Sequence, residues 1–221
     1  QQGNDFSKIQ ARFKTRMKLT SQDVAEVIQK RLLSKNETGT IQLTRVFNEQ
    51  VNNFKTLFDF ADGAQTYRNF HDQEHFIDAY PFIPYQFVLF QRAIQGLSEH
   101  NAFEGKHSSV GERSMLGVFQ QVAMQIGDHE IGQLATFDLM YEGIRSSLKS
   151  NIQQSILNAE LNLDHPFAIN LLKALFLVKY VKEFKASERN LAVLMTERFG
   201  QDISKLRKQV EEALNVLEQQ T

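Results

Sequence analysis

The chain has 221 residues, 42% of them hydrophobic, and a formal net charge of −1. Its 18 Phe residues can supply a packed core, so the composition excludes an intrinsically disordered chain. The near-zero charge gives no overall attraction to nucleic acid. Because the chain has no Cys, disulfides and thiolate metal sites are excluded, which fits a reducing cytosol.

The sequence favours a cytoplasmic protein without a membrane partner. Lys173 and Lys179 interrupt the longest apolar run, at 171–181, so no run reaches the roughly 20 residues that span a bilayer. The chain starts with Gln-Gln-Gly-Asn-Asp, which is not a secretory signal and lacks Met. We therefore expect residue 1 to be a boundary within a larger protein.

Apolar residues recur at three- and four-residue spacing along most of the chain, which predicts an all-α fold. Thr20 suits the N-cap of a first helix, and Pro84 suits the first turn of another because its missing N–H costs nothing there. A looser aromatic segment occupies 67–82. The expected helices cover about residues 20–32, 41–62, 84–97, 112–126, 131–161, 166–184, 188–199 and 203–219.

The last three helices form a separate group in this prediction. We expect a helical bundle over 1–163, followed by a three-helix region over 164–221 that resembles a helix-turn-helix. Asp164 and Pro166 mark the start of the second region, and Gly200-Gln201-Asp202 provides a tight turn before the last helix. An ordinary three-helix bundle has the same pattern, so both readings stay open.

Two motifs carry a resemblance to a known family. The first, Tyr80-Pro81-Phe82-Ile83-Pro84-Tyr85-Gln86-Phe87, predicts a structural corner in which Pro81 and Pro84 fix the chain while Phe82, Tyr85 and Phe87 anchor it in the core. The second is Gly111-Glu112-Arg113-Ser114-Met115-Leu116. Together they resemble BrxC, the large P-loop ATPase of the BREX bacteriophage-exclusion systems, over most of the chain from about Met17.

The resemblance implies a lid-like helical bundle followed by a winged-helix module that stops before its wing. It also implies that the full-length protein is an ATPase that uses ATP and Mg²⁺, works with other BREX proteins, contacts DNA indirectly and forms a homo-oligomer. The chain itself has no G-x-x-x-x-G-K-[ST] motif. We therefore expect this region to be non-catalytic and to hold no cofactor of its own.

Arg113 is the candidate nucleotide-sensing residue. A cation early in a helix is mildly unfavourable, so something anionic is expected opposite it. In ATPases of the AAA type, an Arg early in a lid helix reaches the nucleotide phosphates, and the planar guanidinium suits paired bonds to phosphate oxygens. The resemblance assigns this role to Arg113. Pairing with an intramolecular carboxylate is the alternative.

Two further sets of residues have competing interpretations. His71 and His75 fit an H-x-x-E-H zinc pattern, but no third ligand is evident and aromatic residues surround them, so we predict no metal site. Lys205, Arg207 and Lys208 lie where a recognition helix would contact DNA or a protein partner. Glu211 and Glu212 follow one turn later, which also fits a solvated helix face.

The leading hypothesis is a non-catalytic region of a BrxC-like ATPase that couples nucleotide state to assembly of a phage-defence complex on DNA. A helical adaptor for protein partners and a DNA-binding helix-turn-helix regulator are the alternatives. An upstream P-loop would favour the first, and a basic surface patch would favour the regulator.

Overall fold

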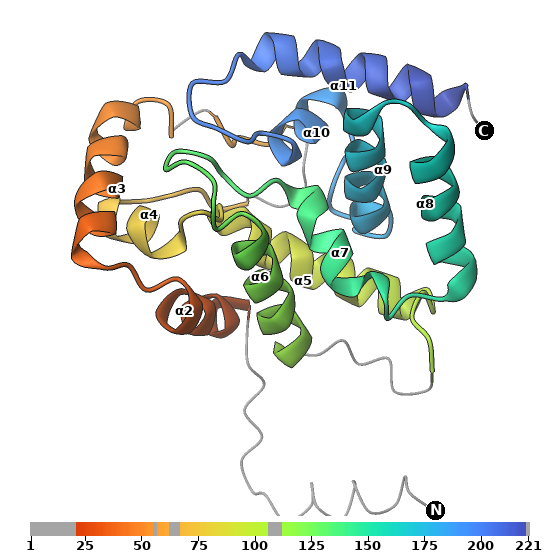
Figure 1. Cartoon of the computed structure of the whole chain (residues 1–221), viewed down its shortest axis with the longest axis horizontal. Coiled ribbons are helices and arrows are strands. Elements are labelled where there is room, and N and C mark those ends of the chain that lie inside the picture. Colours follow the sequence, from red (N-terminus) through yellow and green to blue (C-terminus); the bar gives the residue numbers. More distant parts are fainter. Residues whose placement is uncertain (1–20, 55–56, 62–66, 106–111, 220–221) are drawn as a thin grey trace, which may run out of the picture.

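The computed structural model describes residues 21–54, 57–61, 67–105 and 112–219, with only the backbone of 21–23 and 112–114. Within these ranges the fold is all-α, which confirms the predicted class (Figure 1). Extended segments there pair only as isolated bridges. The helices are α2 (Ser21–Leu32), α3 (Glu37–Gln50), α4 (Gln73–Ala79), α5 (Pro84–Glu99), α6 (Glu112–Gln125), the 3₁₀-helix η1 (Phe137–Leu139), α7 (Met140–Arg145), α8 (Ser150–Asn162), α9 (Pro166–Val178), α10 (Glu188–Leu194) and α11 (Ile203–Glu218).

Short polar side chains set the start of several helices. Asn36 accepts a hydrogen bond from the backbone N–H of Gly39 and begins α3, and Asp72 does the same for α4. Ser187 and Asp202 cap α10 and α11. These bonds satisfy N–H groups that have no partner inside the helix.

Helix α9 lies at the centre of the C-terminal half. It packs against α5, α7, α8, α10, α11 and η1. Figure 1 shows it between α8 on one side and η1 and α7 on the other. Its sequence, PFAINLLKALFLV, is apolar nearly all round, as a helix covered on several sides requires. Lys173 is its single charged residue.

The prediction of one helix over 131–161 is wrong. Residues 127–136 form a connection before η1, and Gly132 has a φ of 108°, which ordinary helical residues cannot adopt. The N–H of Ala135 donates to the carbonyl of Pro81 at 3.0 Å, and the Gln86 side chain donates to the carbonyl of Ala135 at 2.6 Å. These long-range bonds replace helical ones. A second break follows α7, where the N–H of Lys149 donates to Ala102.

Three other helix bounds also differ from the predicted ones. The helix expected over 41–62 starts earlier and ends at Gln50, because the next turns carry Phe54 into an aromatic cluster with Phe70, Phe76 and Phe199 at centroid distances of 5.1 to 5.4 Å. The helices expected over 166–184 and 188–199 end at residues 178 and 194. The looser aromatic segment 67–82, to which the prediction assigns no helix, contains α4.

The buried side chains form one continuous cluster across position 163. Leu171, Leu191 and Leu206 belong to it together with Phe90 and Phe137. The division into 1–163 and 164–221 therefore stays a prediction, and the two parts share a core in this structure.

Gln86 provides a test of the corner. Its side chain is fully buried and bonds both the N–H of Ile83 and the carbonyl of Ala135. We expect Gln86→Ala to lower the free energy of unfolding by about 2 to 4 kcal/mol, because it leaves two buried backbone groups unsatisfied. Gln95→Ala, on the exposed side of the same helix, should change the free energy of unfolding by less than about 0.5 kcal/mol. Urea titrations of both variants measure the two effects. Equal effects of the two substitutions would contradict this role.

Two glycines test the contact of α6 with α7. A methyl group at Gly143 would lie 2.7 Å from the Val118 side chain, whereas nothing lies within 4 Å of one at Gly117. Gly143→Ala should therefore destabilise the protein by about 1 to 2 kcal/mol through overpacking. Gly117→Ala should stabilise it by up to about 1 kcal/mol through helix propensity. In thermal melting, the melting temperature should fall for Gly143→Ala and rise for Gly117→Ala.

Candidate functional site

The candidate nucleotide sensor, Arg113, lies in the first turn of α6, and its side chain is outside the described residues. The rest of α6 packs on the core. Phe119 of α6 stacks on Phe87 of α5 with ring centroids 4.8 Å apart, and α6 also packs against α2 and α7. Helix α6 therefore contacts the corner, through Phe87, and α7.

The predicted corner residues lie where α5, α6 and α10 meet. Phe82, Tyr85 and Phe87 are buried, and so is Pro84, whereas Pro81 is half-buried. The Tyr85 hydroxyl donates to the carbonyl of Val193 in α10 at 3.4 Å. Burial raises the pKa of this hydroxyl, so it stays protonated and remains a donor.

The predicted basic cluster is exposed on α11. Lys205, Arg207 and Lys208 are all exposed, and a guanidinium nitrogen of Arg207 lies 4.0 Å from a carboxylate oxygen of Glu188. Leu206, Val210 and Ala213 face the opposite way and are buried, and α11 packs on α9 and α10. The cluster is thus available to a partner, but Glu211 and Glu212 are exposed one turn further along.

The connection between α10 and α11 covers 195–202, so it is longer than the tight turn over 200–202 that we predicted. A helix-turn-helix usually joins its two helices by three or four residues. Part of this connection pairs with the middle of the chain, because the N–H of Leu134 donates to the carbonyl of Glu197 at 2.7 Å. The winged-helix interpretation stays a prediction.

The rings of His71 and His75 are tilted by 32° relative to each other, with centroids 4.0 Å apart. Nε2 of His71 is 3.1 Å from a carboxylate oxygen of Asp72. Among the described residues, no group of three or more His, Asp or Glu side chains could hold a metal ion. The absence of a metal site stays a prediction.

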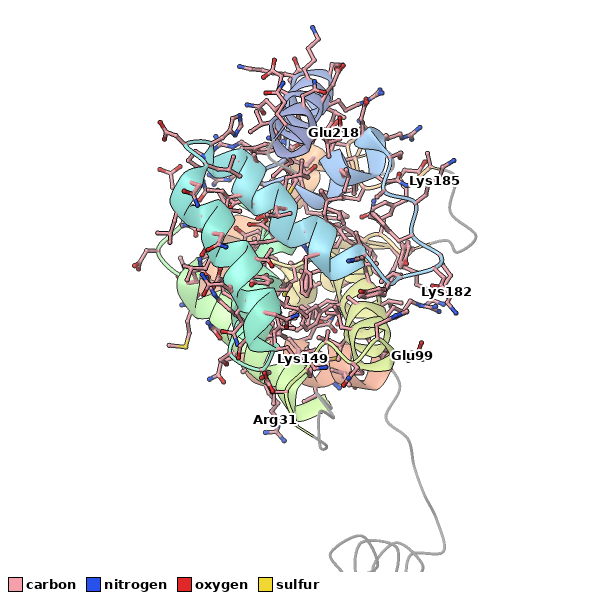
Figure 2. All side chains as sticks on the ribbon, turned by 90° about the vertical axis from the view of Figure 1, so that its right-hand side faces the viewer. Arg31, Glu99, Lys149, Lys182, Lys185 and Glu218 are labelled. Carbon is pink, nitrogen blue, oxygen red and sulfur yellow. The ribbon has the colours of Figure 1, made fainter. Side chains whose placement is uncertain are left out.

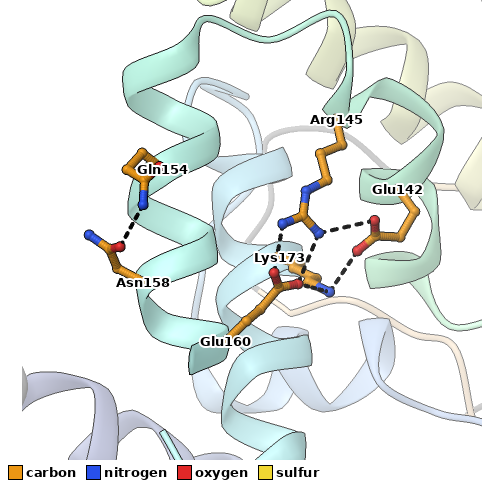
Figure 3. A network of polar contacts seen from close by, with 6 residues as sticks. All are labelled: Glu142, Arg145, Gln154, Asn158, Glu160 and Lys173. Carbon is orange, nitrogen blue, oxygen red and sulfur yellow. Dashed lines mark hydrogen bonds and ion pairs between the residues drawn. The ribbon is translucent and has the colours of Figure 1, made fainter. Parts of the chain in front are cut away.

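A four-residue ion network joins α7, α8 and α9, and sequence reasoning missed it (Figure 3). Arg145 of α7 makes two bonds to Glu160 of α8, at 2.6 and 3.1 Å. Lys173 of α9 lies 2.6 Å from Glu142 and 2.8 Å from Glu160. Two cations and two carboxylates thus neutralise each other where three helices meet.

The pKa shifts in this network have definite causes. The hydrogen bond from Arg145 holds the pKa of Glu160 below its ordinary value. Burial on its own lowers the pKa of Lys173, but the hydrogen bonds to Glu142 and Glu160 outweigh burial and the net shift is upward. Glu160 is therefore ionised at neutral pH and Lys173 is protonated, so their ion pair joins α8 to α9. Its signal in the sequence was a lone lysine in an apolar helix.

Figure 2 looks onto α8 and α9 and labels four cations, Arg31, Lys149, Lys182 and Lys185, together with the carboxylates Glu99 and Glu218. None of the described helices combines the length and apolarity needed to cross a bilayer.

The chain was compared with known families and solved structures. No family model matches it, and no solved structure is significantly similar to it. The class that the structure defines is an all-α protein with one continuous core. The relationship to BrxC and the activity of the full-length protein are therefore proposals that stand on the motif residues.

The ion network gives a pH-dependent prediction. Glu160→Gln should lower the free energy of unfolding at pH 7 by about 1 to 2 kcal/mol, a partial effect because water reaches some of the network. In the folded protein the pKa of Glu160 is below its ordinary value of 4.5, so this stabilisation is present above pH 4.5 and is lost as the pH falls through the folded-state pKa.

Urea titrations at pH 7 and at low pH measure the effect. The matched control is Glu26→Gln, which removes an exposed pair of Glu26 with Lys30 on α2 and should cost less than about 0.5 kcal/mol. If Glu160→Gln lowered the free energy of unfolding equally at pH 7 and at low pH, charge pairing would not be the source of the effect.

Proposed function

We propose that this chain is a non-catalytic helical region of a BrxC-like ATPase, which couples nucleotide state to assembly of a phage-defence complex on DNA. The full-length protein would bind ATP and Mg²⁺ through a P-loop that this chain does not contain. The other proteins of the defence system would be its partners.

The observation that carries this proposal is an unbroken series of packed helices from α6 to α11. Helix α6 packs on α7, α7 and η1 pack on α9, and α9 packs on α11. Packed protein interiors are dense and shift as units, so a displacement at one end of such a series moves the other end. This arrangement connects the helix of Arg113 with the exposed cluster on α11.

A second candidate function is supported by the charges on α11. A helical adaptor would use this exposed helix to bind a protein, and basic residues that are followed by Glu211 and Glu212 suit a protein surface of mixed charge. The DNA-binding regulator is supported less well, because Glu211 and Glu212 weaken attraction to phosphates. The adaptor would need no nucleotide at all, which separates it from the first proposal.

The test uses a full-length protein that contains this chain. Arg113→Ala should weaken ATP binding by about tenfold to a hundredfold, because one charge-assisted hydrogen bond contributes about 1.5 to 3 kcal/mol. Arg113→Lys should restore little, since an ammonium cannot reproduce the planar fork of the guanidinium. ATP-dependent recruitment of the partner proteins to DNA should fall in parallel.

Arg31→Ala is the matched control, because Arg31 is an exposed arginine on α2. It should leave ATP affinity and recruitment unchanged. Recruitment that depends on ATP but not on Arg113 would remove the sensor role of this residue. Recruitment that does not depend on ATP would favour the adaptor.

A further inference from the structure

A cavity of about 500 Å³ opens between α2, α4 and α5. Four apolar residues line it and are called the floor, namely Ala25, Pro84, Phe87 and Val88. The other lining residues, called the rim, are polar or charged and include four that are cationic or can become so, namely Arg68, His71, His75 and Arg92. A volume of this size is typical of a small-molecule site.

Two of the rim groups have unused hydrogen-bonding capacity. Nδ1 of His75 is buried and has no hydrogen-bond partner among the described residues. A buried polar atom without a partner is unfavourable unless a ligand or water satisfies it. Arg68 is exposed, and it forms no ion pair with any of the residues that the structure describes. A ligand oxyanion in the cavity would provide acceptors for Arg68, whereas Nδ1 of His75 is not accessible from the cavity.

Two other charged residues of the lining are already paired. Arg92 lies 2.6 Å from Glu183, and Glu26, the one carboxylate of the rim, lies 2.5 Å from Lys30. Asp72, which lies 3.1 Å from Nε2 of His71, and Asp78 are not among the residues that line the cavity. Within the lining, Arg68 and Arg92 outnumber the single carboxylate, Glu26, which favours an anion.

We propose that this cavity binds a small organic oxyanion of the phosphate-ester class. Its phosphate would lie between Arg68 and the adjacent imidazoles of His71 and His75, and its apolar body would cover the floor at Pro84 and Val88. The site is separate from Arg113 and from the proposed ATPase function. A guanidinium and an imidazolium are suitable donors because both make charge-assisted bonds to phosphate oxygens.

Binding should be linked to protonation of His75. In the ligand-free protein, burial and then the neighbouring His71 lower the pKa of His75. The charged groups that face it are Arg68, His71, Asp72 and Asp78, with Glu26 and Arg92 across the cavity. A bound phosphate adds negative charge beside the ring and so raises this pKa, and by linkage the protonated protein binds the phosphate more tightly.

The experiment titrates the imidazole resonances of the whole chain by NMR, with His75→Gln to assign His75. Phenyl phosphate should raise the pKa of His75 by about one unit, which corresponds to about tenfold tighter binding to the protonated form. Phenol, which has the apolar body alone, should not move it. Inorganic phosphate should move it only at higher concentration, because it cannot use the apolar floor.

Arg68→Gln should weaken phenyl phosphate binding at least tenfold, and Arg31→Gln is the control of equal charge change on an arginine outside the cavity. Equal weakening by both substitutions would show non-specific attraction and overturn the site. A pKa of His75 that phenyl phosphate leaves unchanged at its highest soluble concentration would overturn it as well. So would stoichiometric zinc on His71 and His75 that excludes phenyl phosphate.

Discussion

Burial of α9 is the constraint on which the rest of the fold depends. A helix that is apolar nearly all round must be covered on several sides, and α5, α7, α8, α10 and α11 provide that cover. The single charge of α9 is on Lys173, and a partly buried ammonium without partners would destabilise the folded state. Ion pairs with Glu142 and Glu160 offset this cost, and they also fix where α7 and α8 lie against α9.

Buried polar groups fix the positions of the connecting segments. Gln86 joins the start of α5 to Ala135, and Asn190 of α10 bonds both the N–H and the carbonyl of Ala61. Each pair is far apart in sequence, so these bonds hold loops on the core where no regular backbone pairing could. Apolar contacts are non-directional and tolerate several arrangements, whereas a buried amide with two partners accepts few.

The sequence predicts those parts of the fold that depend on local signals. Helices α5, α6 and α11 were recognised from spacing and from Pro84, and Asp202 caps α11. Local signals fail where distant contacts decide, as at Ala135, whose backbone bonds with Pro81 and Gln86 replace the predicted long helix. Similarly, the H-x-x-E-H spacing put two histidines on one face, but neither the cavity beside them nor the unpartnered Nδ1 follows from spacing.

The same packing determines what kind of function the chain can support. In the described part of the chain, the charged network has all its members paired and so has no free group for chemistry, whereas Arg68, Lys205 and Lys208 are exposed at positions away from it. A core held by neutralised charges can move as one body, and exposed cations at its edges can contact anions or partners without disturbing it. The exposed cations can therefore exchange partners when a ligand binds while the members of the paired network keep theirs.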